Sequence, residues 1–183
     1  IQGDDPHYYR AIATPKHYAV HSGPESTRHE VNIDPSAHDL WDTYLPAFRA
    51  TITDGKADSI MCSYNAVNGI HTTANRFLLT DLLRDRWGFR GYVVSDCDAV
   101  GDICRTQHFV PTYAEAAALA VNAGCDINCG KTLQKYLGDA VDQMLIGESV
   151  LDQALIRAFT GRVLLGDFDP PEQSPYYSAS SVS

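Results

Sequence analysis

Short apolar runs that end in polar residues alternate along the chain with longer segments of helical periodicity. The apolar runs lie at residues 11–17, 58–64, 91–94 and 125–128. Short continuous runs of this kind are typical of parallel strands that are buried on both faces. The pattern therefore predicts four strands, each followed by polar residues at its carboxyl end.

The segments between and after these runs carry apolar residues at helical spacing. Ser36, Thr112 and Ser149 are each followed three residues later by an acidic residue, which is typical of a capped helix start. Pro46 predicts a kink in the first helix, and Asn68-Gly69 predicts a turn. We predict helices over residues 36–55, 75–87, 112–124, 132–146 and 149–166.

The alternation of strands and helices predicts an α/β fold with parallel strands joined by right-handed helical crossovers. Four such units are half of an eight-fold barrel, whose usual length is about 250 residues. We therefore predict a partial TIM-type (β/α)8 barrel of about four βα units over residues 1–166. A small doubly wound sheet is the alternative, but the sequence has no GxGxxG or GxxxxGK[ST] phosphate loop. Residues 167–183 are predicted to be a linker or disordered tail.

The composition is that of a globular protein, with 183 residues, 44% of them hydrophobic and 20% charged. The net charge of −9 argues against nucleic acid or an anionic membrane as a partner. No apolar run approaches the roughly 20 residues that span a bilayer, and the N-terminus lacks the pattern of a signal peptide. Because Ile1 is not a start methionine, we expect the chain to be part of a longer protein.

The five cysteines contain no CxxC pair, so a zinc site is not predicted. Their odd number leaves at least one without a partner in the chain. Buried or free thiols are the simplest interpretation, while a disulfide such as Cys97–Cys129 is compatible with the sequence if the protein is exported.

Four polar residues follow different predicted strands, namely Lys16, His17, Tyr64 and Asp96. Carboxyl ends of parallel strands meet at one edge, where catalytic groups of barrels lie, so we expect these residues to converge. Asp96 could serve as a nucleophilic carboxylate, which must stay ionised, and nearby donors would lower its pKa.

Each candidate also has a structural interpretation. Asp96 or Asp98 could cap the helix that follows the strand. Lys16 could be a surface charge and His17 a structural histidine. Met61 and Tyr64 could fill the core or its rim, and Trp41 and Trp87 lie on helical stripes as packing residues.

Four motifs in continuous order closely resemble glycoside hydrolase family 3, and they look most like its β-xylosidase and β-glucosidase branch. The resemblance covers residues 1–172. The motifs are Lys16-His-Tyr-Ala-Val-His-Ser-Gly-Pro-Glu25 with Arg28-His29, Met61-Cys-Ser-Tyr-Asn-Ala-Val-Asn-Gly69, Leu82-Leu-Arg-Asp-Arg-Trp-Gly-Phe-Arg-Gly91, and Val94-Ser-Asp-Cys-Asp-Ala-Val100.

The resemblance implies a retaining, exo-acting β-glycosidase that releases terminal non-reducing sugars from plant-wall oligosaccharides. Asp96 matches the family's nucleophile and Lys16-His17 the pair that holds hydroxyls of the terminal sugar. Tyr64 matches the tyrosine beside the nucleophile, and Met61 lines the same subsite. In the retaining mechanism the carboxylate attacks the anomeric carbon, a second acid protonates the leaving oxygen, and water releases the sugar. No metal or cofactor is implied.

The resemblance also implies that parts of the enzyme lie outside this sequence. Residues 1–166 match the C-terminal half of the barrel domain, and the first half and a second domain would be further parts of the same polypeptide. In most two-domain members a Glu of the second domain is the general acid. A single-domain branch uses a His within an Asp-Ser-His triplet, but this chain has Thr27-Arg28-His29 there, so we do not assign His29 as the acid.

The leading hypothesis is therefore a fragment of a β-xylosidase or β-glucosidase whose substrate is a small oligosaccharide. Alone, we expect the fragment to be inactive, and we expect the whole protein to be extracellular or periplasmic. A non-catalytic carbohydrate-binding or barrel-completing fragment that needs a partner chain is the alternative. An aldolase-like enzyme with Lys16 as a Schiff base is a distant third.

Overall fold

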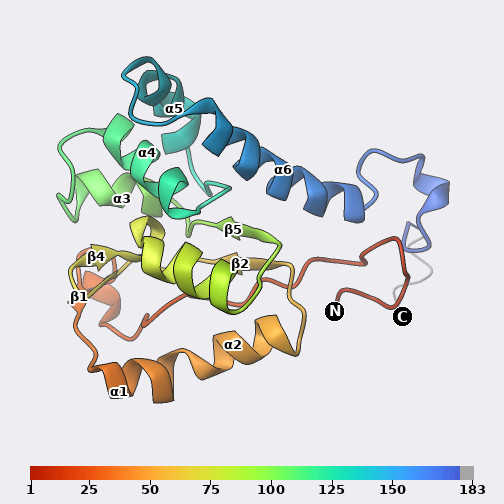
Figure 1. The fold of residues 1–183 in the computed structure, drawn as a ribbon, viewed down its shortest axis with the longest axis horizontal. Coiled ribbons are helices and arrows are strands. Elements are labelled where there is room, and N and C mark those ends of the chain that lie inside the picture. The colour runs from red at the N-terminus through yellow and green to blue at the C-terminus, as the bar shows by residue number, and fades with distance from the viewer. Residues whose placement is uncertain (178–183) are drawn as a thin grey trace.

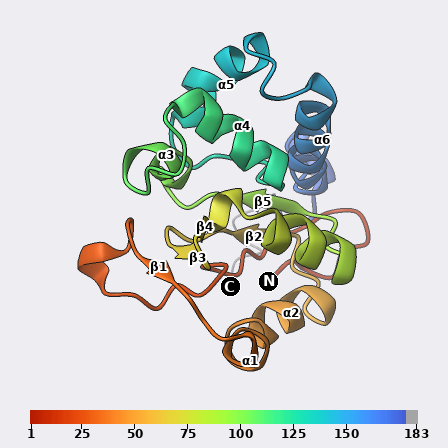
Figure 2. The ribbon, with the colours of Figure 1, turned by 60° about the vertical axis from the view of Figure 1, so that its left-hand side comes forward.

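The computed structural model describes residues 1–177, which form a mixed α/β structure around two small sheets. Helices α1 and α2 lie on one side of strands β2 and β5, and helices α3 to α6 lie on the other side (Figures 1 and 2). Both described ends of the chain lie at the same end of the molecule in Figure 1. The predicted α/β class is confirmed.

Strands β2 (Ser59–Met61) and β5 (Tyr92–Val94) pair in parallel and form the centre of the structure. Met61 lies opposite Val94, so both strands end at the same level. A further chain segment runs beside each of them. Tyr18 forms a parallel bridge with Cys62, and Ile127 forms one with Val94. Four chain segments therefore run side by side in their sequence order, with their carboxyl ends at one edge.

The prediction of a strand over residues 11–17 is wrong, because the segment is irregular except for the bridge at Tyr18. It still contacts β2 through hydrogen bonds from Ser59 N to Ala13 O and from Met61 N to Pro15 O. Pro15 has no backbone N–H, so it cannot donate to a regular ladder. The fourth predicted strand, 125–128, is likewise reduced to the bridge at Ile127.

A second sheet, which the sequence pattern did not predict, combines β1 (Asn32–Ile33), β3 (Ala66–Val67) and β4 (Ile70–His71). Strands β3 and β4 are antiparallel and are joined by Asn68 and Gly69, which have positive φ angles of 50° and 80°. Asn and Gly are the residues that tolerate this conformation in a tight hairpin. The predicted turn at Asn68-Gly69 is confirmed.

The first predicted helix is divided into α1 (Ala37–Asp39), a π-helical stretch (Leu40–Tyr44) and α2 (Pro46–Thr53). Ser36 caps its start by accepting a hydrogen bond from Asp39 N. Pro46 begins α2, where its missing N–H costs nothing. The predicted 75–87 helix is a π-helix over Phe77–Arg86. Short 3₁₀ turns lie at Glu25–Thr27, Thr72–Ala74 and Pro171–Gln173.

Helices α4 (Tyr113–Ala123) and α5 (Thr132–Asp142) lie within their predicted ranges, and α6 spans Glu148–Leu164. Thr112 and Glu115 form the complete capping box of α4, and Gly124 ends it in the left-handed conformation. Helix α6 begins at Glu148 with Gly147 as its N-cap, so it starts one residue before the predicted range and Ser149 is not its cap. Helix α3 (Ala99–Arg105) follows β5 directly and was not predicted.

The main core lies between the strands and the surrounding helices. The four leucines of the π-helix are all buried, and they share this core with residues of both central strands. A smaller cluster joins α4, α5 and α6. The main contributors are Leu78, Leu79, Leu82, Leu83, Ile60 and Val93.

Within residues 1–177 the strands do not close into a barrel, and no helix is long and apolar enough to cross a bilayer. In the predicted linker or tail, the described part returns to the start of the chain. The Tyr176 hydroxyl accepts hydrogen bonds from the backbone N–H groups of Asp4 and Asp5, at 3.2 and 3.1 Å. The part of that prediction that concerns residues 178–183 lies outside the described residues.

Candidate active site

Asp96 lies just after β5, at the edge where the central strands end. It is only 8% exposed. One carboxylate oxygen accepts a hydrogen bond from Cys97 N at 2.7 Å, and the other lies 3.3 Å from His17 Nε2. The carboxylate is thus held on one side by its own loop and faces a nitrogen donor from a neighbouring segment.

Tyr64 and His17 bring two donors to this carboxylate from the adjacent strand ends. Burial, together with the Asp96 carboxylate, raises the pKa of Tyr64 to about 12, so its hydroxyl keeps its proton. Burial lowers the pKa of His17, and the Asp96 carboxylate opposes that shift. A neutral His17 and a protonated Tyr64 can both donate to an ionised carboxylate without cancelling its charge.

The other two predicted residues lie close to this group. Lys16 is exposed, and its charge is among those that lower the pKa of His17. Met61 is half-buried at the last position of β2. The structure therefore brings Asp96, His17 and Tyr64 together, with Lys16 and Met61 at the same strand ends.

The capping alternative fails for Asp98 and leaves Asp96 available. Asp98 occupies the position before α3, but its side chain accepts no capping hydrogen bond and its φ angle is +64°. A disulfide joins Cys97 to Cys129 and ties the loop that carries Asp96 to the end of the adjacent segment. Cys62, Cys104 and Cys125 are free. The disulfide that the sequence left open is thus present.

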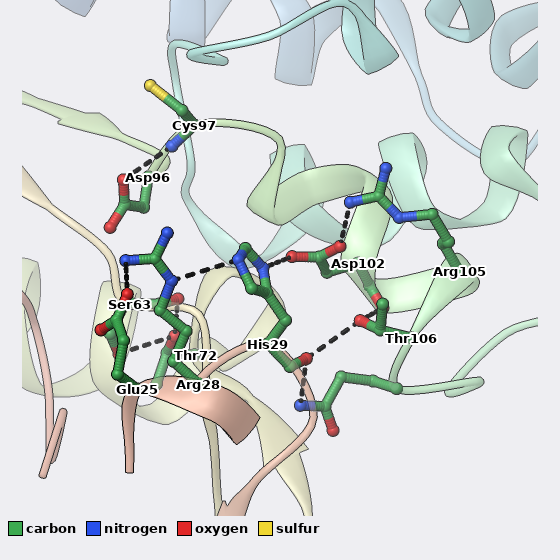
Figure 3. A network of polar contacts seen from close by, with 11 residues as sticks. Glu25, Arg28, His29, Ser63, Thr72, Asp96, Cys97, Asp102, Arg105 and Thr106 are labelled. Carbon is green, nitrogen blue, oxygen red and sulfur yellow. Dashed lines mark hydrogen bonds and ion pairs between the residues drawn. The ribbon is translucent and has the colours of Figure 1, made fainter. Parts of the chain in front are cut away.

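A second polar group, which the sequence reasoning did not assign, lies beside the first. His29 Nδ1 lies 2.6 Å from Asp102 Oδ2, and Arg28 Nε donates to His29 Nε2 at 3.2 Å (Figure 3). Arg28 and His29 stand in a long polar loop without periodicity, and Asp102 lies in the unpredicted helix α3. The first family motif includes Arg28-His29, but neither it nor the polar composition of the loop indicated a contact with Asp102.

Two members of this second group, His29 and Arg28, lie against the Tyr64 ring. The His29 ring centroid lies 4.1 Å from that of Tyr64, and the Arg28 guanidinium lies 5.1 Å from the Tyr64 ring. His21 contributes a further ring, 4.9 Å from that of His17.

Within residues 1–177, no group of three or more His, Cys, Asp or Glu side chains could hold a metal ion. The arrangement suits a carboxylate that reacts as a nucleophile among neutral donors.

Residues 3–160 match the family model described as "Glycosyl hydrolase family 3 N terminal domain". The chain belongs to this family. An exo-1,4-beta-xylosidase (bxlB) of Emericella nidulans is 44% identical over 184 residues, which cover 97% of this chain and 24% of that protein. A probable exo-1,4-beta-xylosidase (bxlB) of Aspergillus fumigatus is 42% identical over 175 residues, which cover 92% of this chain and 23% of that protein.

Solved structures of glycosidases are similar in fold to this chain. A GH3 exo-beta-xylosidase (XlnD) in complex with a xylobiose aziridine activity based probe matches with a TM-score of 0.90 and 36% identity, over 95% of this chain and 23% of that chain. A β-glucosidase from Erythrobacter marinus matches with a TM-score of 0.82 and 31% identity, over 93% of this chain and 23% of that chain. The chain thus spans about a quarter of the length of its relatives and is a fragment of the family's catalytic domain.

Proposed function

We propose that the chain is the nucleophile-bearing part of a retaining, exo-acting β-glycosidase, a β-xylosidase or β-glucosidase that releases terminal non-reducing sugars from plant-wall oligosaccharides. The observation that carries the proposal is the buried Asp96 carboxylate at the end of β5, 3.3 Å from His17 Nε2. Family membership supports it, because these relatives are named as glycosidases of both kinds.

Asp96 is the proposed nucleophile. The oxygen that faces His17 would attack the anomeric carbon of the terminal sugar and form a covalent glycosyl-enzyme, which water then hydrolyses. Tyr64 keeps its proton because its pKa is about 12, so it donates to the carboxylate and orients the attacking oxygen. Neutral donors leave the charge of the attacking carboxylate uncompensated by a cation.

The proposed subsite for the terminal sugar is lined by Lys16, His17 and Met61. Lys16 is exposed and carries three donors, so it can reach sugar hydroxyls from the rim. His17 contacts Asp96 and holds a hydroxyl near the reacting carbon. Met61 supplies an adaptable apolar surface for the face of the ring.

The rest of the proposed enzyme belongs to the same polypeptide. The first half of a (β/α)8 barrel would complete the sheet beside residues 13–18, and a second domain would supply the general acid. This chain spans about a quarter of its relatives, which leaves room for both. The Cys97–Cys129 disulfide supports an extracellular or periplasmic site of action, where disulfides persist.

The test is the Asp96→Asn variant of a full-length enzyme that contains this segment, assayed with aryl β-xylosides and β-glucosides. We expect kcat/KM to fall at least about 10⁴-fold, the scale of loss when a nucleophile is removed. Asp98→Asn, two residues further on, is the matched control and retains activity. Normal turnover by Asp96→Asn would refute the assignment.

The isolated 183-residue chain should not hydrolyse these substrates, because a missing general acid alone costs about 10²- to 10⁴-fold. Isothermal titration of the isolated chain with xylobiose addresses the alternative of a carbohydrate-binding or barrel-completing fragment. Tight binding of xylobiose by the isolated chain, together with no hydrolysis by the full-length enzyme, would favour that alternative over the catalytic proposal.

A further inference from the structure

Tyr64 packs against two side chains of the loop that follows the Lys16-His17 pair. The His29 ring lies 4.1 Å from the Tyr64 ring at an interplanar angle of 47°, and the Arg28 guanidinium lies 5.1 Å from the Tyr64 centroid. The Tyr64 hydroxyl interacts with Asp96. The orientation of the hydroxyl therefore depends on where His29 and Arg28 are held.

His29 is itself anchored to α3, the helix that follows the nucleophile loop. Its ring contacts the fully buried Asp102 at 2.6 Å, and the other oxygen of Asp102 accepts from Arg105. Its backbone carbonyl accepts from Thr106 Oγ1 at 2.9 Å and from Gln107 Nε2 at 3.0 Å (Figure 3). Both the ring and the main chain of His29 are thus fixed to one end of α3.

The contacts of His29 also determine its tautomer. Arg28 Nε donates to His29 Nε2 at 3.2 Å, and a guanidinium has no acceptor to offer in return. The ring proton must therefore lie on Nδ1, where it is donated to Asp102 Oδ2. In this state Nε2 is occupied by Arg28, which leaves no proton on that nitrogen for a leaving group.

We infer that His29 is a positioning residue that, held by Asp102, fixes Tyr64 against the Asp96 carboxylate. The inference rests on the proposed function of Asp96. Asp96 lies in the loop between β5 and α3, and Asp102 lies in α3 itself. His29 contacts both Asp102 and Tyr64, and Tyr64 interacts with Asp96, so these contacts link the loop of the nucleophile to the helix that follows it. A shift of the loop would move the donor away from the nucleophile.

The test uses His29→Phe and His29→Gln in a full-length enzyme that contains this segment. Phe keeps a ring against Tyr64 but loses both ring hydrogen bonds, whereas Gln keeps a donor and an acceptor. We expect kcat/KM to fall about 10²-fold in His29→Phe, as for a catalytic group displaced by about 1 Å, and to recover in part in His29→Gln. His38→Gln is the matched control, because His38 is an exposed histidine beside Asp39 on α1.

The leaving group separates positioning from acid catalysis. A positioning residue affects aryl xylosides with good and poor leaving groups equally, since Asp96 attacks both. Loss of a general acid lowers kcat/KM for substrates with poor leaving groups and leaves kcat/KM for activated substrates nearly unchanged. A loss confined to poor leaving groups, or normal kcat/KM in His29→Phe, would overturn the inference while Asp96→Asn remains inactive. Activity in Asp96→Asn would instead refute the proposed function.

A measurement on the unmodified enzyme covers the case in which the variants do not fold. Long-range ¹H–¹⁵N NMR of histidine-labelled protein reports the tautomer of each ring. We expect His29, identified by its contact with Tyr64, to carry its proton on Nδ1. A proton on Nε2 at neutral pH would contradict the arrangement on which the inference depends.

Discussion

At the scale of single residues, the proposed nucleophile Asp96 faces groups that are neutral. His17 stays neutral because burial lowers its pKa, and Tyr64 stays protonated because its pKa is raised to about 12. Neither side chain carries a charge, and each presents a hydrogen-bond donor to Asp96. A buried polar group such as this carboxylate needs hydrogen-bond partners, and these donors supply them.

Tyr64→Phe tests the role of the tyrosine hydroxyl. We expect kcat/KM of the full-length enzyme to fall about 10- to 100-fold, because a hydrogen bond to a charged group is worth about 1.5–3 kcal/mol. Steady-state hydrolysis of an aryl β-xyloside measures this loss. Tyr177→Phe, at an exposed tyrosine near the described end of the chain, should leave the rate unchanged. An unchanged rate in Tyr64→Phe would show that its hydroxyl does not assist Asp96.

His71 makes stability depend on pH. Burial lowers its pKa to about 4, against the opposing charge of Asp102, while the unfolded chain titrates near its ordinary value of 6.5. Between these values the unfolded state binds more protons, so stability is full above pH 6.5 and falls as the pH drops toward 4. The contribution lost between pH 7 and pH 5 is about 2 kcal/mol.

Urea unfolding of the chain at pH 7 and pH 5 measures this dependence, with His71→Asn as the test variant. His71 Nδ1 accepts from Thr73 N, a cap that the Asn oxygen can replace. We expect His71→Asn to remove most of the pH dependence and His38→Asn, at an exposed site, to retain it. Equal pH dependence in both variants would contradict the assignment to His71.

At the scale of elements, the sequence predicted what depends on local periodicity and capping. The helices with caps or long apolar stripes were predicted, as was the turn at Asn68-Gly69. Two-residue strands such as β1 are too short to carry a period. Helix α3 is short and contains Gly101, which lowers its helical signal. The 11–17 segment fails as a strand because Pro15 cannot donate to β2.

The residues of the candidate site were likewise predicted only where a local pattern places them. Asp96, His17 and Tyr64 could be predicted together because each follows an apolar run, and the ends of parallel runs converge. Arg28 and His29 could not be placed, because no period fixes the path of their loop. Asp102 could not be paired with His29, since the two are brought together by the tertiary fold 73 residues apart.

The capping box of α4 is a local feature with a measurable value. Thr112 Oγ1 accepts from Glu115 N, and the Glu115 carboxylate accepts from Thr112 N. Thr112→Ala removes the side-chain cap, so we expect the free energy of unfolding to fall by about 1 kcal/mol. Urea unfolding measures this change. Thr43→Ala, at an exposed position, should change stability by less than about 0.5 kcal/mol, and an equal effect in both would refute the cap.

At the scale of the whole molecule, the disulfide holds the edge where the site lies. Cys97 and Cys129 are 32 residues apart in sequence, and they join the loop of Asp96 to the last of the four parallel segments. Closing a loop of this length restricts the unfolded chain and stabilises the fold by about 3–4 kcal/mol.

The Cys97→Ser, Cys129→Ser double variant should therefore unfold at a lower urea concentration, with a loss of about 3 kcal/mol. Cys104→Ser is the control, since Cys104 is free and only partly buried. A double variant as stable as the control would show that the disulfide does not stabilise the chain.

Asp96 is the residue proposed to form the covalent bond to the sugar. A 2-deoxy-2-fluoro-β-xyloside with an activated leaving group would trap the glycosyl-enzyme of the full-length protein, because the fluorine slows release of the sugar. After reduction and tryptic digestion, residues 91–105 form one peptide that contains Asp96, Asp98 and Asp102. Fragmentation by mass spectrometry should place the added mass on Asp96. A label on Asp98, on Asp102 or on another peptide would contradict the assignment of Asp96 as the nucleophile.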